Sequence, residues 1–296
     1  MSVFIIISCV VVLAVVFGFL GNACTVYLVL RHRSLWRWMN IFHVSLSFAD
    51  CISLSTTLPG LLVLTWPGQL DSTELRVGCA LFAFSGITCN VISITQLTEI
   101  SVIRFFRIIR PKHHTHDCIY AVCLVAPWLL GISSALISFR TSFILTSLPG
   151  TCLSVTASWM KHPGVYTIIT ISYSSVVIVA SAYTLIVLHL WQMLNQRVQP
   201  EPAPRPQGST PALKRNQEAT LVSIILVATF ALSYLPCPTL LLVHRTLGTV
   251  PAEEAIIATF LCAQLSSVWN PYLYALRKRA FRRKFIRVLR SLTCSK

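Results

Sequence analysis

The chain has 296 residues, of which 55% are hydrophobic and only 11% are charged, and its mean hydropathy is +0.71. Soluble domains carry about 25% charged residues, so this composition excludes an ordinary water-soluble protein and indicates a membrane protein. The net charge of +15 would by itself suggest nucleic-acid binding, a question that the placement of the basic residues decides.

Seven long apolar runs follow one another along the chain and predict its membrane-spanning elements. A helix needs about 20 apolar residues to cross a bilayer, and long runs without polar–apolar alternation indicate helices rather than barrel strands. The predicted spans are 3–30, 39–65, 77–106, 118–138, 165–191, 220–243 and 255–276. The predicted fold class is therefore an all-α membrane protein, with a seven-helix bundle over 1–276 and an amphipathic helix and tail over 277–296.

The first run is predicted to be a spanning helix rather than a cleaved signal peptide. It is too long for a signal peptide, it lacks a basic leading region, and it contains Asn22 where cleavage would need small residues. Met1 is expected at the membrane edge, so the segment ahead of the bundle is expected to be very short.

Basic residues lie mostly on one side of the predicted bundle. An odd number of spans places the termini on opposite sides, and 20 of the 24 Lys and Arg residues fall on the C-terminal side. The positive-inside rule then predicts a cytoplasmic C-terminus and an extracellular N-terminus. The excess charge is attributed to orientation and to contact with anionic membrane lipids, and not to nucleic acid.

The C-terminal tail contains a basic amphipathic segment. Phe281, Phe285, Val288 and Leu289 share one helix face at spacings of three and four residues, and arginines occupy the other face. This pattern predicts a helix on the inner leaflet, with a solvated charged tail as the alternative. Cys294 follows the segment and is a candidate for palmitoylation.

Two inner segments carry no signal of a catalytic or metal site. Residues 192–219 are rich in Pro and Gln and are predicted to form a flexible connector whose prolines forbid regular helix. The sequence PKHHTHD at 111–117 is interpreted as a basic loop, because membrane metal enzymes need several separate His clusters. Nucleophile, nucleotide and Gly-rich motifs are absent from the sequence, so an enzyme is not predicted and no cofactor is expected apart from a possible ion.

Asp50 is the one acid inside the second predicted span, and it therefore must face the bundle interior. Its candidate partners are oxygen- or amide-bearing side chains on other spans: Asn22, Ser93, Ser266 and Asn270. Oxygen ligands around a carboxylate suit a small hard cation, with sodium the obvious one. A hydrogen-bonded structural acid without an ion is the alternative.

Prolines inside the last two spans predict bends. Pro236 lies in the sequence FALSYLPCP of the sixth span, and Asn270-Pro271 lies in the sequence WNPYLY of the seventh. Proline removes a helix hydrogen bond and bends the axis, so two bent helices beside a polar interior suit a protein that changes shape.

These residues together resemble the rhodopsin-like family of G-protein-coupled receptors. The resemblance covers all seven helices and includes the spacing of 25 residues between Cys79 and Arg104. It rests on Asn22, Asp50, Cys79, Arg104, Trp128, Cys152, Pro236 and the motif Asn270-Pro271-Tyr272-Leu273-Tyr274.

The resemblance implies a plasma-membrane receptor with an extracellular small-molecule ligand and a heterotrimeric G protein as partners, and arrestin as a further candidate partner. Arg104 would meet the G protein, or Tyr183 and Tyr274, when the sixth helix swings outward. Cys79 and Cys152 would form a disulfide. The remaining implied sites are a sodium site of Asp50, Ser93 and Asn270, switch and hinge residues Phe230, Tyr234, Pro236, Asn270 and Pro271, and a ligand pocket of Gly86, Asn90, Tyr173, Tyr234, Cys237 and Gln264.

The sequence departs from the family pattern where coupling is expected. Ile103 replaces the acid that usually precedes Arg104 and pairs with it, and Phe105 replaces the tyrosine that usually follows. Asn216 offers no carboxylate for a second restraint, although Glu218 could substitute. Elsewhere, Ser175 and Tyr234 stand where the family has a proline in the fifth helix and a tryptophan in the sixth.

Three interpretations of Arg104 stay open. The arginine without its acid indicates either a receptor with raised basal signalling or an altered coupling surface, as in a decoy or arrestin-biased receptor. Alternatively, Arg104 only reaches the lipid interface. A seven-helix transporter is a further alternative, which the lack of internal repeats disfavours.

The ligand class is constrained by what the pocket lacks. Gly86 stands where aminergic relatives place an aspartate, and no lysine lies between Glu254 and Lys278 to bind retinal, which disfavours amines and opsins. The short N-terminal segment gives little support to a peptide ligand. Apolar outer halves with a few cations indicate a lipid-like or acidic small molecule, and FALSYLP with Tyr234 resembles, more weakly, medium-chain fatty-acid-sensing receptors.

Overall fold

The computed structural model of the chain describes residues 2–65, 72–110, 116–140, 163–196, 211–277 and 279–293. Within these ranges the regular elements are all helical, so the predicted all-α fold class is confirmed. The elements in chain order are α1 (Ser2–Arg31), the short 3₁₀ helix η1 (Arg33–Leu35), α2 (Trp38–Thr65), α3 (Ser72–Ile109), α4 (Asp117–Arg140), α6 (Pro163–Gln196), α7 (Pro211–Tyr234), α8 (Pro236–Leu247), α9 (Glu253–Arg277) and α10 (Arg279–Thr293).

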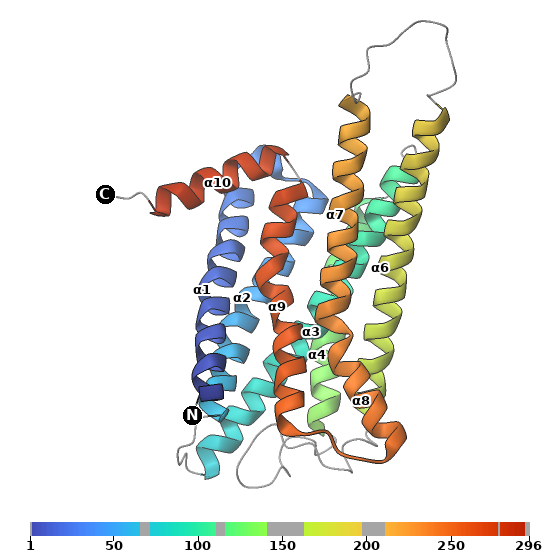
Figure 1. Ribbon diagram of the computed structural model, residues 1–296. Coiled ribbons are helices and arrows are strands. Elements are labelled where there is room, and N and C mark those ends of the chain that lie inside the picture. The colour runs from blue at the N-terminus through green and yellow to red at the C-terminus, as the bar shows by residue number, and fades with distance from the viewer. Residues whose placement is uncertain are drawn as a thin grey trace, which may run out of the picture.

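The long helices stand side by side in one bundle, and α10 lies across one end of it (Figure 1). We call this the α10 end; the start of α1 lies at the opposite end. Phe281 and Phe285 of α10 are buried against Tyr274 and Tyr272 of α9, respectively. The predicted amphipathic helix after the last span is therefore confirmed, and its apolar face docks on the bundle.

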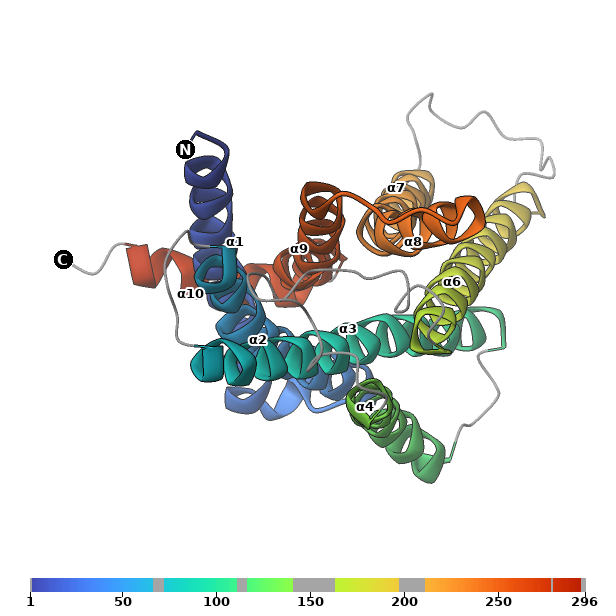
Figure 2. The ribbon, with the colours of Figure 1, turned by 90° about the horizontal axis from the view of Figure 1, so that it is seen from below.

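Helix α3 is tilted through the bundle and packs against α2, α4 and α6, as the view along the bundle shows (Figure 2). Its apolar side chains pack into clusters with α2 and α4 on one side and with α6 and α7 on another. This central course places Ser93 and Arg104 of α3 inside the bundle, where both are buried.

Among the described residues, four helical segments are long and apolar enough to cross a membrane, and α7 with α8 makes a fifth if the bent pair is counted as one span. The four segments are Ser8–Arg31, Phe84–Ile109, Asp117–Ile137 and Tyr166–Met193. Helices α2 and α9 both carry buried polar side chains toward the interior, including Asp50, Ser53, Gln264 and Ser267. Both helices contribute side chains to the polar site described below.

The sixth predicted span is divided into α7 and α8, which are bent by 43° relative to each other. The break is at Leu235, directly before Pro236, whose ring cannot donate the next backbone hydrogen bond. Pro271, by contrast, lies inside α9, which continues through it to Arg277. Of the two predicted bends, only the one at Pro236 interrupts the helix.

The predicted connector at 192–219 is wrong at both ends. Helix α6 continues to Gln196 and α7 already begins at Pro211, so only 197–210 lies outside the described residues. Proline is tolerated in the first turn of a helix, where its missing N–H has no partner to lose. The residues after Pro211, ALKRNQE, are mostly good helix formers, which explains the early start of α7.

Candidate functional site

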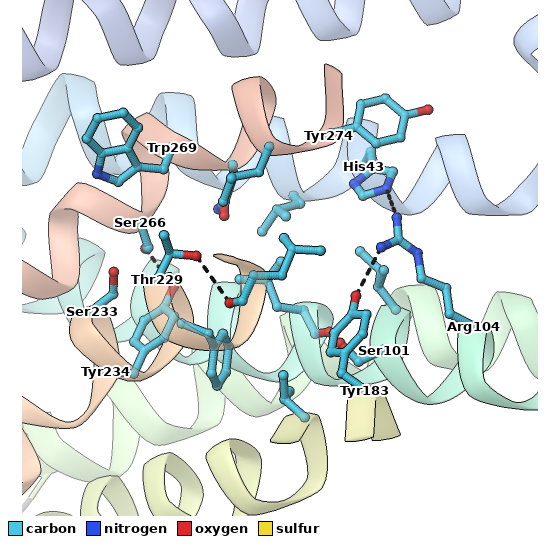
Figure 3. A pocket seen from close by; sticks show the side chains of 18 residues that line it. His43, Ser101, Arg104, Tyr183, Thr229, Ser233, Tyr234, Ser266, Trp269 and Tyr274 are labelled. Carbon is cyan, nitrogen blue, oxygen red and sulfur yellow. Dashed lines mark hydrogen bonds between the residues drawn. The ribbon is translucent and has the colours of Figure 1, made fainter. Parts of the chain in front are cut away.

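Arg104 lies inside the bundle and connects α3 with two other helices. Its side chain is only 9% exposed. Nη1 donates to the hydroxyl of Tyr183 on α6 at 3.0 Å, and Nη2 lies 3.3 Å from Nε2 of His43 on α2. Figure 3 shows the guanidinium between these two side chains. The arginine therefore makes specific contacts across the interior and does not merely reach toward lipid.

Tyr274 of α9 completes this group from the other side. Its ring lies against the imidazole of His43, with 3.8 Å between ring centroids, and its hydroxyl donates to Oδ1 of Asn40 at 2.6 Å. We call Arg104, His43, Asn40, Tyr183 and Tyr274 the arginine cluster. It joins α2, α3, α6 and α9 within the bundle.

A small cavity of about 50 Å³ extends from the arginine cluster into the bundle, between α2, α3, α6, α7 and α9 (Figure 3). Its walls reach Tyr234 and Ser266, which share a hydrogen bond of 2.7 Å. Such a volume holds a few water molecules, whereas drug-sized ligands occupy about 300 Å³ or more. The cavity is therefore suited to water and to side-chain movement, and not to an organic ligand.

Three of the five predicted switch and hinge residues, Phe230, Tyr234 and Asn270, line the wall of this cavity. Phe230 and Tyr234 of α7 lie against each other, with ring centroids 4.9 Å apart, and both are buried. Tyr234 is the last residue of α7, so it sits at the point where the helix breaks before Pro236. A change of the bend angle would move Tyr234 relative to Ser266 of α9.

Asp50 of α2 is fully buried and is the shared acceptor of a second group. Its Oδ1 accepts hydrogen bonds from the hydroxyls of Ser93 at 3.1 Å and Ser267 at 2.8 Å. Its Oδ2 accepts one from Nδ2 of Asn270 at 2.9 Å. We call these four residues the carboxylate cluster. It brings α2, α3 and α9 together midway between the two ends of the bundle.

Two of the predicted partners of Asp50 are placed differently. Ser266 bonds Tyr234, and the neighbouring Ser267 takes the expected place beside the carboxylate. Asn22 of α1 donates to the backbone oxygen atoms of Gly18 and Ser267, so it reaches the cluster only through the backbone of α9. Its Oδ1 is buried without a hydrogen-bond partner among the residues that the structure describes.

The sequence pattern described as 7 transmembrane receptor (rhodopsin family) matches residues 21–274, which include both clusters. The chain belongs to the rhodopsin family of seven-transmembrane receptors. Members of this family are receptors rather than enzymes and cross the plasma membrane several times, so the chain is a multi-pass membrane receptor. The family also accounts for seven spans, since its pattern extends from α1 to α9.

Two relatives match this receptor over more than nine tenths of its length at modest identity, and a third matches less than half of it. The neuromedin-K receptor of Rattus norvegicus is 25% identical over 293 residues, covering 94% of this chain and 62% of the relative. The somatostatin receptor type 3 of Rattus norvegicus is 26% identical over 306 residues, covering 96% and 68%. The D(3) dopamine receptor of Mus musculus is 28% identical over 131 residues, covering 42% and 28%. The chain thus spans less than two thirds of the length of the neuromedin-K receptors.

The predicted pocket residues of the receptor are distributed over α3, α6, α7, α8 and α9. Gly86 of α3 faces Thr57 of α2, and Tyr173 of α6 shares a hydrogen bond of 2.8 Å with Thr239 of α8. Gln264 of α9 accepts a hydrogen bond from Ser53 of α2. The predicted pocket residues thus take part in several separate contacts between helices.

On α3, Oδ1 of Asn90 and Oγ1 of Thr88 are buried without a hydrogen-bond partner among the described residues. Cys237 lies just after the break between α7 and α8 and is partly buried. Unpaired buried acceptors are costly unless water or a ligand meets them. Asn90 is therefore the pocket residue that most needs a partner.

Several predicted sites lie outside the described residues. Cys152 and Cys294 belong to segments that the structure does not describe, and of Cys79 only the backbone, within α3, is described. The predicted disulfide and the lipidation site therefore stay predictions. The same holds for Glu218, whose position on α7 is described without its side chain.

The structure also adds residues that the sequence analysis did not single out. At the α10 end, Trp38 donates to Asp117 at 2.6 Å and stacks on Tyr120, which accepts a hydrogen bond of 3.1 Å from Arg107. These contacts fix the ends of α2, α3 and α4 relative to one another. Single polar and aromatic residues near loop ends carry no spacing signal that would have indicated them.

Proposed function

We propose that the chain is a G-protein-coupled receptor that binds a small extracellular ligand and activates a heterotrimeric G protein by an outward motion of α7. The observation that carries the proposal is Arg104, buried within a receptor bundle and bonded to Tyr183 and His43. The break at Leu235 supports the proposed motion of α7, because it allows α7 to change its angle while α8 stays in place.

The proposed orientation puts the α10 end in the cytoplasm and the start of α1 outside the cell. The basic residues that follow the last span support this orientation through the positive-inside rule. Helix α10 would then lie on the inner leaflet with its arginines facing anionic lipid headgroups. Cys294 would be close enough to the membrane to carry a palmitoyl chain.

The proposed ligand is a lipid-like or acidic small molecule. Arg245 supports it, because its guanidinium lies 3.8 Å from the centre of the Tyr166 ring at the end of the bundle opposite α10. The relatives are named after neuromedin K, somatostatin and dopamine, so family membership alone leaves the ligand class open. Gly86 at the start of the proposed pocket offers no counter-charge for an amine.

Ligand-free signalling tests the proposed coupling. Wild type is expected to activate at least one G-protein subtype above mock-transfected cells, and Arg104→Ala is expected to remove that signal. Ile103→Asp is expected to lower it roughly fivefold or more, because an adjacent acid would hold the guanidinium in the resting arrangement. The measurement is G-protein activation across the main subtypes, normalised to surface expression.

A decoy or arrestin-biased receptor is the second candidate, and the absence of an acid at Ile103 is the observation that favours it. If no subtype responds, Ile103→Asp changes nothing and arrestin is nevertheless recruited, this second candidate replaces the first. Arrestin recruitment measured on the same cells therefore separates the two.

The carboxylate cluster is proposed to hold an allosteric sodium ion. The donor chemistry fits: a carboxylate and two hydroxyl oxygens converge in a buried site, and oxygen ligands are the ones that hard cations prefer. The unpaired Oδ1 of Asn22 nearby is a further oxygen that lacks a partner within the described part of the chain. Asp50, Ser93 and Ser267 would hold the ion, which would supply a positive charge that stabilises the buried carboxylate.

Sodium is expected to raise the melting temperature of the purified receptor by about 2 °C or more over N-methyl-D-glucamine at equal ionic strength. Asp50→Asn is expected to remove that difference while keeping the size of the side chain. Ser47→Ala, which alters a buried hydroxyl of α2 outside the carboxylate cluster, is the control and is expected to keep the difference. An equal response of Asp50→Asn and wild type would contradict the site.

A further inference from the structure

We propose that His43, with Asn40 on the same face of α2, restrains Arg104 and Tyr274 in the resting receptor and thereby replaces the acid that is missing at position 103. The inference rests on the proposed function, because it names a regulatory contact of the same coupling residue. His43 is a positioning residue in this proposal, since it acts on signalling through Arg104.

The hydrogen bond between His43 and Arg104 has a defined direction. A guanidinium has only donors, so Nε2 of His43 must be the acceptor at the observed 3.3 Å. The imidazole is then neutral, with its proton on Nδ1. Both side chains are buried, at 8% and 9% exposure. A hydrogen bond from a charged donor is stronger than a neutral one, and the low dielectric of the interior strengthens it further.

The same imidazole also holds Tyr274. The ring of Tyr274 lies 3.8 Å from that of His43, measured between centroids, with an angle of 37° between the planes. Asn40 precedes His43 by three residues, a spacing that places both on one helix face. Its Oδ1 accepts the hydrogen bond of the Tyr274 hydroxyl, and its Nδ2 donates to the backbone oxygen of Leu35 at 2.6 Å. Helix α2 therefore contacts Tyr274 of α9 at two points, its ring and its hydroxyl group.

The isoleucine at position 103 does not supply this restraint. Ile103 packs against the apolar cluster that includes Met39, Phe42 and Ile100. An isoleucine has no acceptor to offer the guanidinium that follows it. The acceptor observed next to Arg104 comes instead from α2, through a residue 61 positions earlier in the chain.

The contact between His43 and Arg104 is expected to favour the resting state, because the proposed coupling requires the Arg104 side chain at the α10 end. In the arginine cluster the guanidinium points across the bundle to α2 and α6 (Figure 3). To meet a G protein at the α10 end, the side chain must leave His43, whereas its bond to Tyr183, which the family resemblance expects when the sixth helix swings outward, can be kept. A contact that exists in only one of two conformations shifts the equilibrium toward that conformation. Removing the acceptor is therefore expected to favour the signalling state.

The test compares two substitutions of the same residue. His43→Phe keeps a ring for Tyr274 but removes the acceptor, and it is expected to raise ligand-free signalling about three- to tenfold. His43→Gln restores an oxygen acceptor and is expected to stay near wild type. Asn40→Ala, which removes the acceptor of Tyr274, is the second variant and is expected to raise the signal in the same direction. Ser47→Ala on the same helix is the matched control.

A second readout separates this inference from the proposed function. An energy-transfer sensor with a luciferase at the C-terminus and a fluorescent acceptor inserted within 197–210 reports the bundle conformation in cells that lack G proteins. A sensor signal that changes in His43→Phe and Asn40→Ala and returns to the wild-type value in His43→Gln supports the restraint. This holds even if no G protein responds; the lack of a G-protein response would overturn the proposed coupling and not the restraint. Sensor and signalling values of His43→Phe and Asn40→Ala equal to or below wild type, at matched surface expression, would overturn the restraint while leaving the coupling intact.

Discussion

Asp50→Ala is expected to destabilise the receptor by roughly 3 kcal/mol or more, because it removes the acceptor of two buried hydroxyl donors and one partly buried amide donor at once. Ser93, Ser267 and Asn270 lie on two helices that contact α2 only partly through apolar packing, and each would be left without its bond to the carboxylate. Each buried donor that loses its partner costs about 1–3 kcal/mol. The measurement is thermal unfolding of purified receptor in lipid nanodiscs, with surface expression in cells as a second readout.

Asp50→Asn is the informative comparison for that experiment. Asparagine keeps an oxygen that can accept from one or two of the donors, although its amide faces another donor, so an intermediate loss of stability is expected. Ser47→Ala controls for the loss of a buried polar group on α2. Equal melting temperatures of Asp50→Ala and wild type would show that the carboxylate cluster contributes little to the stability of the bundle.

The fold was predictable because the hydrocarbon interior of a bilayer permits few backbone structures. Apolar runs of spanning length must form helices, and their order gives a bundle. The two proline bends were not equally predictable. Pro236 interrupts the sixth span, whereas α9 continues through Pro271. An added Cβ at Gly21 would lie only 2.7 Å from Cγ of Pro271, so α1 packs closely on this proline, and the sequence of α9 alone does not contain that contact.

The carboxylate cluster was partly predictable for a similar reason. A single acid in a span must face the interior, so Asp50 and partners on other helices followed from the sequence. The sequence did not decide between Ser266 and Ser267 as the partner of Asp50, because both are near the face of α9 that Asn270 occupies. The rotation of α9 about its own axis decides it, and that rotation depends on packing against its neighbours.

The burial of His43 was predictable from its spacing to Asp50. It precedes Asp50 by seven residues, two helical turns, and therefore shares the interior face of α2. The pattern thus predicts that His43 is buried. It does not predict the contact with Arg104, because that depends on the tilt of α3 across the bundle (Figure 2).

Gly131 has the second large expected effect, and it concerns the packing of α4 on α3. An added Cβ at this position would lie 2.7 Å from the backbone oxygen of Thr88 and 2.9 Å from Cγ1 of Ile92. A backbone atom cannot rotate away as a side chain can, so α4 would have to move away from α3. Gly131→Ala is therefore expected to destabilise the receptor by about 1–3 kcal/mol, the usual cost of overpacking.

Gly78→Ala on α3 is the matched control, because its added Cβ would meet nothing within 4 Å in the part of the chain that the structure describes. Alanine is favoured over glycine inside a helix by roughly 0.5–1 kcal/mol, so this variant is expected to be neutral or slightly stabilising. The two substitutions are chemically identical and should have opposite signs in thermal unfolding of purified receptor. Since α3 carries both Ser93 and Arg104, a displaced α4 should also lower ligand-free signalling per receptor at the surface. Equal melting temperatures for the two variants would mean that α4 can shift from α3 at little cost, and the close packing at Gly131 would then not fix the position of Arg104.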